Sequence, residues 1–158
     1  MNGRIIEEAL DMLLPLIPAI QQENIGTIVI GNAFGDYHAL GRKIVSTFLK
    51  LAGFEVIDLG LSVDNRKFVE TVVKQTGAKL VCVSALIIHT AKEVIGLRKQ
   101  LDQHGLTDVK ILVGGAPFNF EPRLAEEVGT TGMARNAVGA IRVAKEMLGV
   151  FQRKETRV

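Results

Sequence analysis

The chain has 158 residues, of which 47% are hydrophobic, and 19 basic residues stand against 17 acidic ones. This length suits one globular domain with its own core, and the near-balance of charge argues against a nucleic-acid surface, which needs a clustered excess of Lys and Arg. The single cysteine, Cys82, excludes an internal disulfide and a cysteine-only metal site, and it suits a reducing cytoplasm.

The first predicted element is an amphipathic helix near residues 3–13, which Pro15 should end or kink. Its apolar residues recur at helical spacing and are Ile5, Ile6, Ala9, Leu10 and Leu13. This segment does not resemble a secretion signal, because Glu7, Glu8 and Asp11 lie where such a signal carries no charge.

Short apolar runs rich in β-branched residues then alternate with helical stretches. Strands are expected at residues 27–30, 54–58, 80–83, 110–113 and 131–134. Helices are expected at residues 37–51, 64–75, 90–104, 122–128 and 136–148. The longest nearly apolar run, residues 80–88, is far shorter than the ~20 residues of a membrane span, so we expect a cytoplasmic protein that contacts no membrane.

This alternation predicts an α/β fold, a Rossmann-like or flavodoxin-like doubly wound sheet of five parallel strands in the order 2-1-3-4-5. In such open sheets, ligands bind beyond the carboxyl ends of the strands, where the strand order reverses. The loops that follow strands one, three and four should therefore converge, and they hold residues 31–41, 84–90 and 114–120.

The first of these loops places Asp36 two residues before His38. A carboxylate at this spacing can hold one ring nitrogen and aim the other at a metal. The alternative is an Asp that caps the following helix, with an exposed His nearby. The other loops carry Ser84-x-Leu86 and the pair Gly114-Gly115. Each of these alone is compatible with a locally satisfied Ser and a simple turn.

Taken together, the order Asp-x-His-x-x-Gly, Ser-x-Leu and Gly-Gly resembles the cobalamin-binding domain of corrinoid proteins and of cobalamin-dependent methionine synthases. The resemblance covers residues 25–149, and residues 53–60 and 113–117 look like the corrinoid carriers of methyl-transfer systems. It implies a cobalamin-binding domain at 25–150 and a helical segment at 1–24 that is the remnant of a helical cap. The polar residues at the C-terminus predict a frayed tail at 151–158.

The resemblance also implies how the cofactor is held. The dimethylbenzimidazole tail would leave the cobalt and lie buried in the domain, with His38 as the axial cobalt ligand and Asp36 on its other ring nitrogen. Thr90 would complete the relay with its hydroxyl, where the family often has Ser. Ile88 and Met133 depart from the family pattern. The implied cofactor-binding residues are Gly35, Asp36, Tyr37, His38, Gly41, Ser84, Leu86, Ile88, Thr90, Gly114, Gly115, Met133 and Ala137.

The implied function is a corrinoid protein that carries a methyl group on cobalt, as methylcobalamin or a related corrinoid, between partner methyltransferases, with a reductive activator as a further partner. Two alternatives remain open: the small subunit of an adenosylcobalamin-dependent mutase, and a module for corrinoid storage, delivery or sensing. No nucleophile–base arrangement stands out, so we do not expect an enzyme in its own right. The apolar stripe of the N-terminal helix predicts a homodimer or partner contact.

Overall fold

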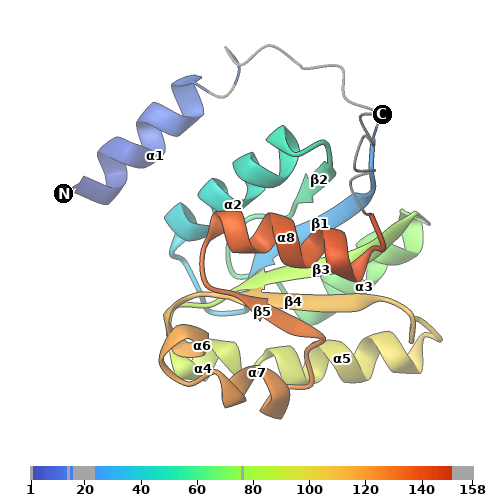
Figure 1. Cartoon of the computed structure of the whole chain (residues 1–158). Coiled ribbons are helices and arrows are strands. Elements are labelled where there is room, and N and C mark those ends of the chain that lie inside the picture. Colours follow the sequence, from blue (N-terminus) through green and yellow to red (C-terminus); the bar gives the residue numbers. More distant parts are fainter. Residues whose placement is uncertain (1, 14, 16–23, 76, 151–158) are drawn as a thin grey trace, which may run out of the picture.

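The computed structural model describes residues 2–13, 15, 24–75 and 77–150 (Figure 1). Its centre is a parallel sheet of five strands in the order β2-β1-β3-β4-β5, which confirms the predicted doubly wound α/β fold. The strands are β1 (Thr27–Asn32), β2 (Glu55–Asp58), β3 (Ala78–Ser84), β4 (Lys110–Gly114) and β5 (Gly132–Ala134).

Helices cover both faces of the sheet (Figure 1). One face carries α2 (Ala39–Leu51) and α8 (Ala137–Met147), with α1 (Asn2–Leu13) lying outside α2. The other face carries five helices, which are α3 (Asn65–Lys74), α4 (Ile88–Ala91), α5 (Val94–Gln103), α6 (Ala116–Phe120) and α7 (Arg123–Glu127).

Alternate residues of each strand enter two separate cores, because successive side chains of a strand point to opposite faces. Ile28, Ile30 and Leu112 pack on the side of α2 and α8. Val29 and Val113 pack on the side of α3 and α5. Since both faces are covered, the strands read as nearly continuous apolar runs.

Two helices differ from the sequence prediction. The predicted helix at 90–104 is interrupted, since α4 ends at Ala91 and α5 begins at Val94. In the turn between them, the Glu93 carbonyl accepts a hydrogen bond from Asn65 Nδ2 of α3 at 2.8 Å. The short helix α6 lies in a segment expected to be a loop, and Pro117 stands in its first turn, where a missing N–H is tolerated.

The N-terminal helix α1 ends two residues before Pro15, as predicted. Asp11 of α1 pairs with Lys43 Nζ of α2 at 2.9 Å, while Ile5 and Ile6 remain exposed. In the part of the chain that the structure describes, no helix combines the length and apolarity that a bilayer crossing needs. The predicted tail at 151–158 lies outside the described residues.

Candidate functional site

The loops after β1, β3 and β4 meet at the carboxyl edge of the sheet, because these three strands are neighbours. Asp36 ties two of them together, since its Oδ2 accepts a hydrogen bond from the backbone N–H of Leu86 at 2.9 Å. The third loop is joined to the second through Ala85, whose N–H donates to the Gly114 carbonyl at 3.1 Å. The three predicted motifs are therefore contiguous in space.

The Asp36–His38 pair has the geometry of an oriented imidazole. Asp36 Oδ1 lies 2.7 Å from His38 Nδ1 and also accepts the His38 backbone N–H at 2.9 Å. The Asp36 side chain is 1% exposed, whereas that of His38 is 61% exposed. With Nδ1 donating to the carboxylate, the neutral ring keeps its lone pair on Nε2, which makes Nε2 the nitrogen able to bind a metal.

The alternative for Asp36, a cap for the following helix, is not what the structure shows. Helix α2 follows His38, and among the described residues no side chain caps its first turn. The Asp36 carboxylate instead accepts its three hydrogen bonds from His38, in the loop after β1, and from Leu86, in the loop after β3.

Thr90 is placed differently from the implied relay. It is buried, but its hydroxyl donates to the Ile87 carbonyl at 3.0 Å. The second oxygen of Asp36 is occupied by the Leu86 N–H, which cannot move a proton as a hydroxyl can. A backbone N–H, and not the Thr90 hydroxyl, therefore contacts Oδ2 of Asp36. The Thr90 hydroxyl instead stabilises the start of α4.

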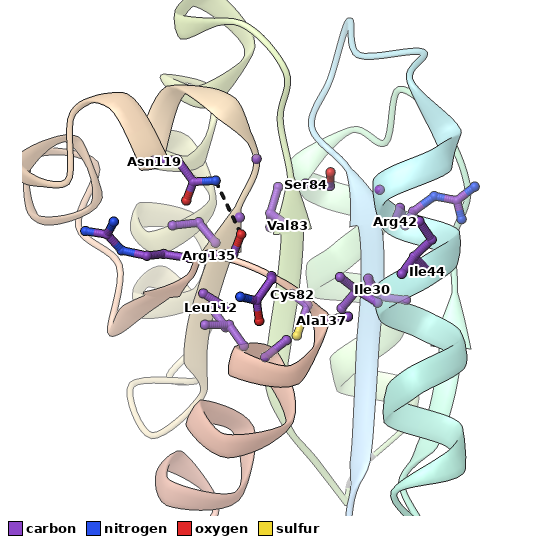
Figure 2. A pocket seen from close by; sticks show the side chains of 18 of the residues that line it. Ile30, Arg42, Ile44, Cys82, Val83, Ser84, Leu112, Asn119, Arg135 and Ala137 are labelled. Carbon is purple, nitrogen blue, oxygen red and sulfur yellow. Dashed lines mark hydrogen bonds between the residues drawn. The ribbon is translucent and has the colours of Figure 1, made fainter. Parts of the chain in front are cut away.

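A cavity of about 410 Å³ lies between the sheet and helices α2 and α8 (Figure 2). Its deep wall consists of Ile30, Cys82 and Leu112, from three adjacent strands. Burial raises the pKa of the Cys82 thiol to about 12, so the thiol is neutral and adds an uncharged surface. Small residues leave the volume open, and they are Gly41, Gly114, Gly115, Ala116, Ala134, Ala137 and Ala140.

Polar groups lie where the cavity reaches the ends of the strands (Figure 2). Ser84 is the last residue of β3, and Asn119 of α6 donates from Nδ2 to the Arg135 carbonyl at 3.3 Å. Asn136 caps α8 by accepting from the Gly139 N–H at 2.8 Å. The cavity can therefore take a ligand with an apolar inner end and a polar outer end.

The glycines at this edge have different physical roles. Gly115 has φ 118°, and a Cβ there would lie 1.9 Å from the Ala85 carbonyl oxygen, so the backbone itself requires glycine. Gly41, in contrast, lines the cavity, and a Cβ there would meet no atom within 4 Å. Gly41 is thus the glycine whose missing side chain adds directly to the open volume.

Five of the thirteen residues implied by the resemblance line the cavity, and they are Gly41, Ser84, Gly114, Gly115 and Ala137. The other eight lie outside the lining, and Asp36, His38 and Thr90 are among them. Met133 packs against the core on the opposite face, because its neighbours Gly132 and Ala134 face the α8 side of β5. Tyr37 and Leu86 are exposed on the loops around His38, and Ile88 is exposed at the start of α4. Gly35 has φ 79° and forms the turn before Asp36.

Two buried polar residues next to His38 escaped the sequence analysis. Asn32 is 0% exposed and Arg42 is 5% exposed. A signal for Asn32 was available, since it is a polar residue at the end of an otherwise apolar strand. Arg42 lies one helical turn after His38, but its direction depends on how α2 packs against the sheet.

A comparison with family models matches residues 26–142 to the B12-binding domain. The dimethylamine corrinoid protein 3 of Methanosarcina acetivorans is 40% identical over 133 residues, which cover 84% of this chain and 61% of that protein. The trimethylamine corrinoid protein 2 of Methanosarcina mazei is 38% identical over 131 residues, covering 82% and 59% respectively. The chain thus spans about three fifths of the length of these relatives.

A solved structure agrees with this likeness. The monomethylamine corrinoid protein of Methanosarcina barkeri superimposes with a TM-score of 0.80 at 33% identity, covering 91% of this chain and 68% of that one. These comparisons agree with the motifs on which the resemblance rests, and they reach beyond the motifs to nearly the whole described sheet and its helices.

Proposed function

The chain belongs to the family of B12-binding domains, and from that premise we propose that it is a corrinoid methyl carrier. In this proposal, it binds cobalamin or a related corrinoid with His38 on the cobalt and its nucleotide tail in the cavity. One observation carries the proposal: the oriented His38 precedes α2, whose first turn supplies Gly41 and Arg42 to the cavity lining.

The residues present fit a corrinoid whose own lower base has left the metal. His38 offers an exposed imidazole with one nitrogen available, as a replacement axial ligand needs. The cavity offers a volume of about 410 Å³ with apolar walls, as a buried aromatic base needs. Ser84 supplies a hydroxyl at the outer end of that cavity.

When bound, the corrinoid supplies a cobalt centre that accepts and releases a methyl group. The contribution of the chain is to hold the proton on His38 Nδ1 and to fix the ring plane through Asp36. Because Asp36 is buried and accepts three hydrogen bonds, it holds the imidazole in one orientation, with Nδ1 toward the carboxylate and Nε2 left as the acceptor nitrogen. The exposed face of His38 leaves room for a large planar ligand.

The names of the relatives support the methyl-carrier proposal over the mutase and storage alternatives. The relatives are corrinoid proteins for dimethylamine, trimethylamine and monomethylamine. We therefore propose partner methyltransferases of the methylamine type, a reductive activator for the cobalt, and a cytoplasmic location. The exposed Ile5 and Ile6 of α1 support a contact with a partner or a second copy of the chain.

The binding part of the proposal is tested with hydroxocobalamin. The protein is mixed with it, free cofactor is removed by gel filtration, and the absorption spectrum of the protein fraction is recorded. About one cofactor per chain should remain bound. Ala137→Leu, which fills the cavity, should lower this amount, while Val138→Leu on the exposed side of α8 should not. A colourless wild-type protein would overturn the proposal.

The carrier part is tested by absorption changes during turnover. The loaded, reduced protein is incubated with a methylamine and its methyltransferase, and the spectrum should change from cobalt(I) to methyl-cobalt(III). A bound cofactor that stays unmethylated with each methylamine methyltransferase would contradict the carrier role while leaving cofactor binding intact.

A further inference from the structure

Two side chains hold His38, and the family motif accounts for one of them, Asp36. Asp36 holds the ring and the backbone N–H of His38, as described above. The backbone carbonyl of His38 accepts a hydrogen bond from Asn32 Nδ2 at 3.1 Å. This contact matters locally, because His38 directly precedes α2 and no side chain in the described part of the chain caps that helix.

The Asn32 amide has one defined orientation because Arg42 fixes it. Arg42 Nε donates to Asn32 Oδ1 at 2.7 Å, and a guanidinium can only donate. The Asn32 oxygen must therefore face Arg42, which leaves the NH₂ group to face the His38 carbonyl. Asn32 is fully buried, so water does not compete for either contact.

Arg42 is in turn fixed by Asp58 at the end of β2. Its Nη1 contacts both carboxylate oxygens of Asp58, and the Arg42 side chain is 6% exposed. Asp58 also accepts the Gly60 N–H at 2.9 Å, which anchors the carboxylate to its own loop. Asp58, Arg42 and Asn32 thus form a continuous polar chain that starts at β2 and ends on the His38 backbone.

Several of the buried polar residues of the fold lie close to His38, and they are Asn32, Asp36 and Arg42. Seven polar or charged residues are buried among those described. Of these, Thr47 and Thr71 only bond carbonyls of their own helices. Asn32 and Arg42 instead form hydrogen bonds between different elements, and these bonds hold His38. A buried polar chain specifies one arrangement only when every member has its hydrogen-bond partners.

Arg42 also borders the cavity, and Figure 2 shows its guanidinium directed away from the open space. A ligand in the cavity would contact the face of α2 that carries Arg42. Arg42 thus lines the cavity and also fixes the orientation of Asn32, which holds the His38 carbonyl.

We propose that Asp58, Arg42 and Asn32 are positioning residues that set the main-chain position of His38, the proposed cobalt ligand. This inference rests on the proposed function, since it concerns the imidazole that would bind cobalt. Asp36 holds the ring and the backbone N–H of His38, and the Asn32 chain holds its backbone carbonyl. Both are needed for Nε2 to remain in one place.

The inference is tested by two substitutions that interrupt the chain at different links. Asn32→Asp keeps an acceptor for Arg42 but removes the donor to the His38 carbonyl. Arg42→Lys keeps a positive charge for Asp58 but cannot form the fork that also holds Asn32. Thr47→Val is the matched control, because Thr47 is buried on the same helix α2 and bonds only the Lys43 carbonyl.

Each protein is loaded with cobalamin and reduced to cobalt(II), and EPR measures the fraction of cobalt coupled to an imidazole nitrogen. The ratio of coupled to uncoupled cobalt should fall by about tenfold in Asn32→Asp and Arg42→Lys. The ratio is taken over the bound cobalt alone, so a change in the amount of bound cofactor does not alter it. Thr47→Val should keep the wild-type ratio. Circular dichroism verifies folding, and Arg42→Lys provides the test if Asn32→Asp does not fold.

The outcomes separate this inference from the function on which it rests. A wild-type ratio in folded Asn32→Asp or Arg42→Lys overturns the positioning role while the proposed function stands. An equal fall in Thr47→Val also overturns it, because general loosening of α2 would then explain the effect. A wild-type protein without imidazole coupling removes the basis of both.

Discussion

The two faces of the sheet are built on the same strands but filled in opposite ways. On the face of α3 and α5, large side chains such as Phe68, Phe118 and Leu97 are completely buried. On the face of α2 and α8, Ala134, Ala140 and other small residues border a cavity of about 410 Å³. Side-chain size on β5, α2 and α8, rather than the arrangement of the strands, therefore creates the binding volume.

This difference assigns different tasks to the two faces. The filled face has the packing contacts that stabilise the domain without any ligand. The hollow face lacks some of these contacts until a ligand supplies them. Substitutions on the filled face should therefore act on the free energy of unfolding, and those on the hollow face on cofactor affinity.

The largest expected effect is on the filled face. Phe68→Ala should lower the free energy of unfolding by about 3–5 kcal/mol, because Phe68 is fully buried and its removal leaves a void. Urea denaturation of the cofactor-free protein measures this change. A loss below about 1 kcal/mol would show that the filled face is not the principal source of stability, and the contrast between the faces would then be wrong.

The next effect tests the strand edge between the faces. Gly115→Ala should destabilise the protein by about 2–3 kcal/mol, because the new Cβ meets the Ala85 carbonyl oxygen and φ is 118°. Thermal denaturation of the cofactor-free protein measures it. An unchanged midpoint together with weaker cobalamin binding would mean instead that Gly115 is required by the ligand.

A third effect tests whether the deep wall of the cavity excludes water. The folded-state pKa of Cys82 is raised to about 12 from its ordinary 9.0, so the folded protein holds this proton more tightly than the unfolded chain. Its stabilising contribution is complete below pH 9.0 and is lost as the pH rises toward about 12. In this window the wild type should lose about 1.4 kcal/mol per pH unit more than Cys82→Ala.

Urea denaturation of both proteins at several alkaline pH values checks this difference in slope. Parallel curves for the wild type and Cys82→Ala would indicate a thiol that titrates normally. Water would then reach the deep wall of the cavity, and the cavity would not provide the apolar surroundings that an aromatic base requires.

The smallest effect on stability separates the two tasks most sharply. Gly41→Ala should raise the free energy of unfolding by about 0.5–1 kcal/mol, because Gly41 lies inside α2 and its Cβ meets no atom. The same Cβ enters the cavity and should weaken hydroxocobalamin binding, measured by equilibrium dialysis. Gly3→Ala, in α1 and away from the cavity, should leave the binding unchanged. Unchanged binding in Gly41→Ala would place the ligand elsewhere.

The order of the sheet and the convergence of three loops were predictable, because hydrophobic alternation along the strands is a local signal and parallel topology places their ends together. The position of Met133 was not predictable to the same degree. Its face depends on the pairing register of a strand of three residues, and a shift of one residue moves a side chain to the other face.

The side-chain contacts inside the site were harder to predict from the sequence than the motifs themselves. The Asp36–His38 contact follows from a spacing of two residues within one loop. The chain from Asp58 through Arg42 to Asn32 joins residues of β2, α2 and β1, so it depends on how these elements pack. The hydroxyl direction of Thr90 likewise depends on the turn that starts α4.

The central claim is that His38 binds the cobalt of a corrinoid while the cavity retains its tail. EPR of the cobalt(II) protein tests both parts when the wild type is compared with His38→Ala. The wild type should show coupling to one imidazole nitrogen, and His38→Ala should lose that coupling while retaining measurable cofactor through the intact cavity. Imidazole coupling that persists in His38→Ala would contradict the account, because another residue would then be the ligand.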